Sequence, residues 1–508
     1  MKLLYVSSVS ATFELENQEI YYCKERYNVF LDSQVVLSGL STNVFSLYDL
    51  TPNTTYKVRV NDKAIKFKTL EVSEVISTKD IEKDGKTNVT KKLQKLIDEA
   101  KENSLIEVEP GTYFITSLRL KSNITLHLKK DAILSCSIKE DDYEEIPGEV
   151  VLEDGSVKQI GTWEGDPKNM KLSILSAFEC NNIHIVGQGT VDGNAQLSTW
   201  WIDHKLKPYA RPHLLYLNHC ENVWVQGVLF MNSPQWTIHP FFSKNVEFYD
   251  FKITNPKISP NTDGLNPQSC IGVKIIGVHF SVGDDCIAIK SGKMYMGKKY
   301  KQPCEDITIR NCLMQFGHGA IVLGSEMSGG IKNLNVERCY FDHTDRGLRI
   351  KTRRGRGDTA IIDNVVFNNI YMDNVLTPLV INMFYFCDPD GKTEYVWSKE
   401  KLPVDDRTPY LGKFTFNNIK AVNCEVCSGY FYGLPEQPIK EININNSYFD
   451  FKENAEEGTP AMMSFAEVCR KRGFVFKNVS TVNVNNVTLY GQIGKEIEVE
   501  GNEVINIE

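Results

Sequence analysis

Short segments in which apolar and polar residues alternate recur along most of the chain, and this pattern predicts β-strands. The predicted strands lie at residues 124–128, 183–186, 223–225, 246–248, 273–276, 307–309, 334–336, 365–367, 442–444 and 482–484. They recur about every 23 to 40 residues, a spacing typical of stacked repeats. The sequence lacks the W-D series of a propeller and the L-x-x-L-x-L frame of a leucine-rich array. We therefore predict an all-β fold, a parallel β-helix.

An asparagine or aspartate precedes many of these strands, as in Asn182-Ile183, Asn222-Val223 and Asn333-Leu334. These residue types favour turns because their side chains bond to nearby backbone groups. We interpret the recurring asparagines as turn residues that can stack in ladders, and we assign them no chemistry.

One region before the repeats has a helical pattern. Leu93, Leu96, Ile97 and Ala100 follow helical spacing within residues 84–103, with Thr87 or Asn88 as the expected N-cap. The first coil of a solenoid exposes apolar core and unpaired strand edges. We therefore expect this helix to cover that end of the repeats.

Residues 1–73 contain short alternating strands and a run from Leu50 to Val60 in which a proline turn precedes Tyr56. This run resembles a fibronectin type III module and predicts a small β-sandwich. We divide the chain into this domain, residues 1–73, and the β-helix, residues 74–508. Packing against or spacing the larger domain is the favoured role of the sandwich, and direct glycan binding is the alternative.

Composition narrows the choice of partners. The 508 residues are 42% hydrophobic and carry a formal net charge of −8, which allows a large core and does not favour nucleic acid as a partner. We find no run long enough to span a membrane. The segment Met1–Val6 has only four apolar residues in a row, Leu3 to Val6, before Ser7, too few for a signal-peptide core of roughly 7–15. We expect a cytoplasmic location, or secretion if the true N-terminus differs.

The 13 cysteines are an odd number without close pairing. Cys180, Cys220, Cys270, Cys304 and Cys339 fall at comparable places in the repeats, which indicates small buried fillers. Free thiols suit a reducing cytoplasm, and a disulfide framework is the alternative interpretation. Because no C-x-x-C pair has a partner, we predict neither a metal site nor a cofactor.

Three aspartates and a histidine follow the rhythm of the repeats. Asp263 precedes Asp284 by 21 residues, and His318 follows Asp285 by 33. Successive coils lie about 4.8 Å apart, so residues one coil apart in sequence become neighbours on one face. Asp-Gly and Asp-Asp are also ordinary turn residues, which is the structural alternative. Several such motifs at coil spacing favour one shared site.

Two carboxylates can hydrolyse a glycosidic bond, one as acid and one as a base that holds water, about 6.5–9.5 Å apart for inversion. Asp284 or Asp285 opposite Asp263 is the candidate pair. Adjacent strand residues point to opposite sides, so Asp284 and Asp285 share a cleft only if Gly283 allows a kink. A β-helix that only binds or displays glycan is the alternative, although binding does not require three carboxylates.

A cluster of cations follows the histidine. Residues 346–356 contain six of them, namely Arg346, Arg349, Lys351, Arg353, Arg354 and Arg356. Arginine grips carboxylates with two parallel hydrogen bonds, so the cluster predicts an anionic ligand such as a uronic acid. We place Arg349, Lys351, Arg353 and Arg354 among the substrate-binding candidates.

A long insertion contributes further candidates. Trp201, Arg211 and His213 lie between two predicted coils, where they could form a stacking wall and sugar contacts. Packing within the loop is the alternative.

The motifs Asn261–Gly264, Gly283–Cys286, Gly317–Gly319 and Arg349–Lys351 together resemble glycoside hydrolase family 28, the polygalacturonase family. The resemblance covers roughly residues 75 to 485 and implies a right-handed parallel β-helix with a helical cap. It implies that Asp284 is the general acid, that Asp263 and Asp285 hold the water, and that His318 supports them. Arg349 and Lys351 would then bind the substrate.

The segments Gly324–Gly330 and Lys351–Gly357 resemble the exo-acting bacterial polygalacturonases, which often carry an N-terminal fibronectin-like module. This resemblance implies hydrolysis of α-1,4 bonds in galacturonate oligosaccharides or polysaccharides, by an inverting mechanism. A rhamnogalacturonan hydrolase or another pectin-fragment glycosidase is the alternative activity, and the sequence predicts no oligomeric state.

Overall fold

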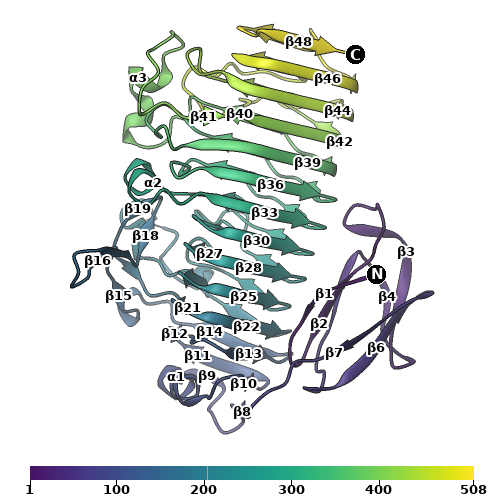
Figure 1. The fold of residues 1–508 in the computed structure, drawn as a ribbon, viewed down its shortest axis with the longest axis vertical. Coiled ribbons are helices and arrows are strands. Elements are labelled where there is room, and N and C mark those ends of the chain that lie inside the picture. The colour runs from purple at the N-terminus through teal and green to yellow at the C-terminus, as the bar shows by residue number, and fades with distance from the viewer. Residues whose placement is uncertain (203) are drawn as a thin grey trace.

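The computed structural model describes residues 1–202 and 204–508 and consists of a long parallel β-helix with a small β-domain beside it (Figure 1). The predicted all-β parallel β-helix is confirmed. Among the described residues, no helix combines the length and the apolar character needed to cross a membrane.

Two faces of the solenoid form one 24-stranded parallel sheet. Its strands are β8 (Val75–Ser77), β9 (Asp84–Asn88), β10 (Ser104–Val108), β11 (Gly111–Ile115), β13 (Ile124–Leu128), β14 (Ala132–Cys136), β22 (Asn181–Gly187), β23 (Thr190–Asp192), β25 (Glu221–Gln226), β26 (Leu229–Met231), β28 (Lys244–Tyr249), β29 (Lys252–Thr254), β30 (Ile271–Ile276), β31 (His279–Ser281), β33 (Cys304–Arg310), β34 (Leu313–Gln315), β36 (Ile331–Glu337), β37 (Tyr340–Asp342), β39 (Ile361–Asp373), β41 (Tyr410–Leu411), β42 (Lys413–Cys424), β44 (Ile439–Phe451), β46 (Val479–Tyr490) and β48 (Val504–Ile507). Every predicted strand falls within one of them.

The third face is built from two shorter parallel sheets that bridges through Leu265 connect. One contains β12 (Leu118–Arg119), β21 (Leu175–Phe178), β24 (Leu215–Asn218) and β27 (Ile238–Phe241). The other contains β32 (Ile287–Ile289), β35 (Ile321–Gly324), β38 (Arg346–Lys351), β40 (Thr377–Asn382), β43 (Cys427–Tyr432), β45 (Arg472–Lys477) and β47 (Ile497–Glu500).

Like residues stack on like residues in successive coils, which explains why the pattern of the sequence is so regular. Val273 pairs with Ile307 and Ile275 with Ile309, and all four side chains are buried in the core. The predicted asparagine ladders are also present. Asn222 and Asn333 adopt left-handed backbone conformations, with φ of 56° for both. The Nδ2 of Asn364 donates to Oδ1 of Asn333 at 2.9 Å, one coil away.

Short hairpins and helices project from the solenoid. The hairpins pair β15 (Glu145–Ile146) with β20 (Met170–Lys171), β16 (Glu149–Val151) with β17 (Val157–Gln159), and β18 (Thr162–Trp163) with β19 (Asp166–Pro167). The helices are α1 (Thr90–Glu99), α2 (Met294–Tyr300) and α3 (Glu394–Trp397), with 3₁₀ turns η1 (Glu140–Asp142), η2 (Ala195–Leu197), η3 (Pro208–Ala210) and η4 (Pro389–Lys392).

The predicted cap helix is α1, but it is shorter than the sequence indicated. It buries Leu93 and Ile97 in the first coils. Residues 84–88 form strand β9 instead of helix, because the open edge of β11 offers them a backbone partner. The predicted N-cap residues are therefore wrong: Val89 occupies that position and makes no side-chain cap bond.

Residues 2–68 form two antiparallel sheets around a core that contains Phe13, Val29 and Phe45. The strands are β1 (Lys2–Val6), β2 (Ala11–Glu14) and β5 (Val44–Leu47) in one sheet, and β3 (Tyr22–Leu31), β4 (Gln34–Thr42), β6 (Thr55–Val60) and β7 (Lys63–Lys68) in the other. The domain packs on the β-helix through Glu14, which is buried and accepts hydrogen bonds from Arg310 at 2.6 and 2.7 Å and from Arg338 at 3.1 Å.

The cysteines pack inside the coils. Cys220, Cys270, Cys304 and Cys339 are buried, whereas Cys180 is partly exposed. All 13 cysteines lie within the described residues and are free thiols. The structure therefore agrees with the interpretation of the cysteines as fillers.

Candidate active site

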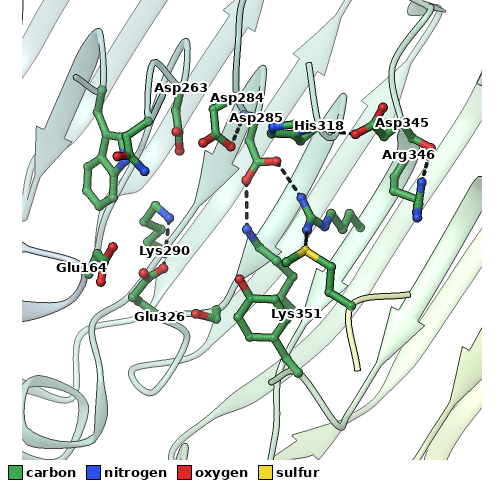
Figure 2. Close-up of a pocket in the computed structure, with 16 residues that line it drawn as sticks. Glu164, Asp263, Asp284, Asp285, Lys290, His318, Glu326, Asp345, Arg346 and Lys351 are labelled. Carbon is green, nitrogen blue, oxygen red and sulfur yellow. Dashed lines mark hydrogen bonds and ion pairs between the residues drawn. The ribbon is translucent and has the colours of Figure 1, made fainter. Parts of the chain in front are cut away.

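A pocket of about 410 Å³ lies where the loops between the faces meet (Figure 2). It is lined by Glu164, Trp236, Asn261, Asp263, Asp284, Asp285, Lys290, His318, Ser325, Glu326, Asp345, Arg346, Arg349, Lys351, Tyr385 and Met462. The structure thus brings together Asp263, Asp284, Asp285, His318, Arg349 and Lys351 from the sequence prediction, at a size within the usual range of ligand pockets.

Successive coils deliver these side chains to the same edge. Asp284 and Asp285 follow β31 and precede β32, while His318 occupies the equivalent turn between β34 and β35. Gly283 permits the close approach of the preceding loop, because a Cβ there would lie 2.5 Å from the backbone oxygens of Pro256 and Ser259. Since neither aspartate lies in a strand, both can line the same pocket.

Asp285 lies among cations at the floor of the pocket. Its side chain is 2% exposed, and its carboxylate accepts hydrogen bonds from Arg349 Nη1 at 3.2 Å and from Lys351 Nζ at 2.9 Å. Burial alone would raise the pKa of Asp285, but Lys351 and Arg349 outweigh burial and hold the pKa below its usual range. Asp285 is therefore an anion at neutral pH.

The pKa values of Asp284 and Asp263 are raised, in contrast to that of Asp285. Burial, and then the charge of Asp285, raise the pKa of Asp284. Burial and the charge of Asp284 raise the pKa of Asp263, which is 3% exposed and accepts a 2.7 Å hydrogen bond from Asn266 Nδ2. The pKa values of the adjacent Asp284 and Asp285 are therefore moved in opposite directions, as acid–base catalysis requires.

His318 is held by a carboxylate outside the aspartate group. Its Nδ1 lies 2.8 Å from Asp345 Oδ2, and half of its side chain is exposed. The hydrogen bond to Asp345 raises the pKa of His318 to about 9, so the imidazole carries a positive charge at neutral pH.

The wall on the other side of the pocket contains residues that the sequence analysis did not select. Lys290 Nζ lies 2.9 Å from Glu326 Oε2 and 4.6 Å from the centre of the Trp236 ring. Burial would raise the pKa of Glu326, but Lys290 and then Lys351 lower it to about 2. Glu326 belongs to the motif Gly324–Gly330, which is the one sequence feature that pointed to this wall. Glu164 lies in an insertion in which no sequence motif indicated a site.

Arg353 and Arg354 do not line the pocket, so their prediction as substrate contacts is corrected. Arg353 is 2% exposed and bonds to Asp390 at 2.7 Å, and Arg354 is 1% exposed and bonds to Glu436 at 2.9 Å. Both guanidinium groups are thus buried in ion pairs within the protein. Their acidic partners come from distant segments, which a local count of charges does not detect.

The candidates from the insertion also lie outside the lining of the pocket. His213 is fully buried, its Nδ1 lies 2.8 Å from the Trp236 carbonyl oxygen, and burial lowers its pKa to about 4. The Trp201 indole donates to the Ser233 carbonyl at 3.3 Å. Both residues therefore pack within the protein, which is the alternative interpretation.

Arg211 does not line the pocket but bonds to a residue that does. It is 2% exposed, and its Nη2 donates to Asn261 Oδ1 at 2.9 Å, behind a residue that lines the pocket. Across the described part of the chain, no group of three or more His, Cys, Asp or Glu side chains is arranged to hold a metal ion.

Comparisons with known proteins give the family of the chain. The family model described as glycosyl hydrolases family 28 matches residues 142–403, which include the aspartates, His318, Arg349 and Lys351. A probable polygalacturonase of Vitis vinifera is 33% identical over 374 residues, which cover 72% of this chain and 71% of the relative. An endo-polygalacturonase of Pectobacterium carotovorum subsp. carotovorum is 27% identical over 315 residues, 59% of this chain and 73% of that protein.

Two solved structures share the fold. A family 28 exopolygalacturonase of Yersinia enterocolitica superposes with a TM-score of 0.73 at 20% identity and covers 99% of this chain and 97% of its own. An exopolygalacturonase of Thermotoga maritima gives 0.66 at 24% identity, with 81% and 92% covered. The family model spans more than half of the chain, and so this protein is a glycoside hydrolase that belongs to glycosyl hydrolases family 28.

Proposed function

We propose that this protein hydrolyses the α-1,4 bonds of polygalacturonate and its oligosaccharides, and that it acts from a chain end. The observation that carries the proposal is the pair of adjacent carboxylates whose pKa values are moved in opposite directions, Asp284 upward and Asp285 downward, in a pocket that also presents cations. Relatives named polygalacturonases support the substrate class.

Asp284 is the general acid in this proposal. Its raised pKa keeps a proton available for the glycosidic oxygen as the bond breaks. Asp285 remains ionised beside Lys351 and Arg349, and with Asp263 it holds the water that attacks the anomeric carbon. Attack from the opposite face inverts the configuration without a covalent sugar–enzyme intermediate.

The positive charges suit a uronate substrate. Arg349 and Lys351 line the pocket beside Asp285, and the imidazolium of His318 lines it as well. A sugar carboxylate that enters the pocket meets these cations, whereas a neutral sugar leaves Arg349 and Lys351 with Asp285 and leaves His318 with Asp345. Charge-assisted hydrogen bonds of this kind are the strong ones in proteins.

A chain-end mode is favoured by the insertion that forms one wall of the pocket. The turn between β18 and β19 contributes Glu164 to the lining, and the backbone oxygen of Gly165 accepts a 2.9 Å hydrogen bond from Lys293 N. The hairpin is thereby fixed onto the coil that follows β32. A wall at this position limits how far a polymer can extend through the site.

The test is product analysis with galacturonate oligomers of three to eight units and with rhamnogalacturonan fragments as the competing substrate. We expect release of one small product from the first minutes, with a slow fall in the viscosity of polygalacturonate. Asp284→Asn serves as the inactive control. Early release of products of many lengths would replace the chain-end mode by internal cleavage, and activity only on rhamnogalacturonan would refute the substrate.

A further inference from the structure

Glu164 is a carboxylate in the lining of the pocket whose position is fixed by the surrounding fold. It lies at the tip of the β18–β19 hairpin in a left-handed backbone conformation, with φ of 46°. Its neighbour Trp163 stacks on Trp236, with ring centres 5.1 Å apart and planes inclined by 24°. On the other side, a Cβ on Gly165 would come within 2.9 Å of the Glu326 side chain. The hairpin therefore presents Glu164 to the pocket on a packed support.

The carboxylate of Glu164 has no direct partner among the residues that the structure describes. Among residues 1–202 and 204–508 it makes no direct hydrogen bond and no ion pair, although Lys293 and Lys290 attract it at longer range. Other acidic residues of the pocket do have partners: Asp285 has Arg349 and Lys351, Glu326 has Lys290, and Asp345 has His318. Burial and the charge of Glu326 raise the pKa of Glu164.

A carboxylate without a direct partner limits which groups of an anionic sugar can lie beside it. An ionised carboxylate is only an acceptor, so it repels a sugar carboxylate and accepts hydrogen bonds from sugar hydroxyls. Figure 2 shows Glu164 across the pocket from His318, Asp345 and Arg346. The cation on the side of Glu164, Lys290, is paired with Glu326, so Glu164 offers an acceptor for sugar hydroxyls, whereas Arg349 and Lys351 beside Asp285 suit the carboxylate of the substrate.

We propose that Glu164 recognises the chain end by accepting a hydrogen bond from the 4-hydroxyl of the terminal, non-reducing sugar. In a 1,4-linked polymer this oxygen carries the next residue in every internal sugar, so only a terminal sugar has a hydrogen to donate. The hairpin adds a physical limit, because its tip stands where a further sugar would continue. This inference rests on the proposed hydrolysis of galacturonate chains and names the residue that selects their ends.

The experiment compares two trisaccharide substrates. One is trigalacturonate, and the other has a 4,5-unsaturated sugar at its non-reducing end and so lacks the 4-hydroxyl. We expect the wild-type protein to prefer the saturated trisaccharide by about 10- to 100-fold in kcat/KM, the value of one charge-assisted hydrogen bond. Glu164→Ala should lower kcat/KM on the saturated substrate by that factor and bring the preference close to one. Glu164→Gln, which keeps an acceptor oxygen, should retain part of the preference.

Asp166→Asn is the matched control, because Asp166 is on the same hairpin, faces Lys293 at 3.6 Å and does not line the pocket. It should keep both the activity and the preference of the wild type. A Glu164→Ala variant that loses the same factor on both trisaccharides, or that keeps the wild-type preference, would overturn the role of Glu164 alone. A wild-type protein without activity on either galacturonide would instead refute the proposed function, and the inference with it.

Discussion

Replacing Lys351 by methionine tests whether the cations of the pocket act through Asp285. Lys351 Nζ is 2.9 Å from Asp285 Oδ2, and Asp285 is 2% exposed, so the removal leaves Arg349 at 3.2 Å as the remaining cationic partner among the described residues. One charge-assisted hydrogen bond contributes about 1.5–3 kcal/mol, which corresponds to a fall of about 10- to 100-fold in kcat/KM.

The pH dependence has a defined sign. Burial raises the pKa of Asp285 and the two cations lower it, so the pKa rises when one cation is removed. A base must be ionised to act, and the acid limb of the kcat/KM profile of Lys351→Met should therefore move to higher pH. The assay is release of reducing ends, measured from about pH 4 to pH 8, which spans the range above the ordinary aspartate pKa.

A double variant separates this mechanism from a direct contact with the substrate. If Lys351 acts through Asp285, adding Lys351→Met to Asp285→Asn causes little further loss, because coupled residues are not additive. Lys274→Met is the control, since Lys274 is half exposed and pairs with Glu247 on the outside of the sheet. A full further loss of about 10- to 100-fold in the double variant would assign the effect of Lys351 to its contact with the substrate. An unmoved acid limb in Lys351→Met would refute the reasoning about the pKa of Asp285.

Four more outcomes are expected. Asp284→Asn should lower kcat by about 10²–10⁴ and recover partly on substrates whose leaving group needs no proton, and proton NMR of the first product should show inversion; a retained configuration would contradict the mechanism. Asp345→Asn should lower the pKa of His318 from about 9, so the imidazole loses its positive charge at a lower pH and the alkaline limb of the kcat/KM profile moves to lower pH. An NMR titration of the imidazole can check the pKa. Glu14→Ala leaves Arg310 and Arg338 without their buried anion, which should destabilise the domain interface by about 3–5 kcal/mol. Proteolysis near residues 69–74 should then be faster, whereas Glu16→Gln, at an exposed position, should not change it. Thiol titration of the unreduced, unfolded protein should find 13 free cysteines, and a count far below that would contradict the structure.

The repeats of the fold were predictable because each coil repeats the same local physics. A strand such as Ile124–Leu128 alternates by itself, and Asn333 needs only its own left-handed turn and the asparagine one coil later. The cap region shows the limit of that reasoning. Residues 84–88 fall within the predicted helix, but they pair with β11 because an open strand edge is available in the folded protein.

The meeting of the three aspartates, His318, Arg349 and Lys351 in one pocket was predictable for a related reason, because residues one coil apart in sequence become neighbours. The positions of the other candidate substrate contacts were not, since their environment depends on segments far away in the chain. Arg349 and Arg354 are five residues apart and chemically identical, yet one lines the pocket and the other is buried against Glu436. Glu164 enters the pocket only because the hairpin docks on Trp236 and Lys293, which no local pattern indicates.

The three aspartates differ in their surroundings more than the sequence implied, and the difference divides their roles. The resemblance treats Asp263 and Asp285 alike, as holders of the attacking water. Asp285 has two cationic partners and a lowered pKa, whereas Asp263 has the neutral Asn266 as its hydrogen-bond donor and a raised pKa. A base must be ionised before it takes a proton, so Asp285 is the one that is ready to do so at neutral pH. Burial and the charge of Asp285 raise the pKa of Asp284 and outweigh the opposite effect of the nearby cations, so Asp284 is the carboxyl that keeps its proton.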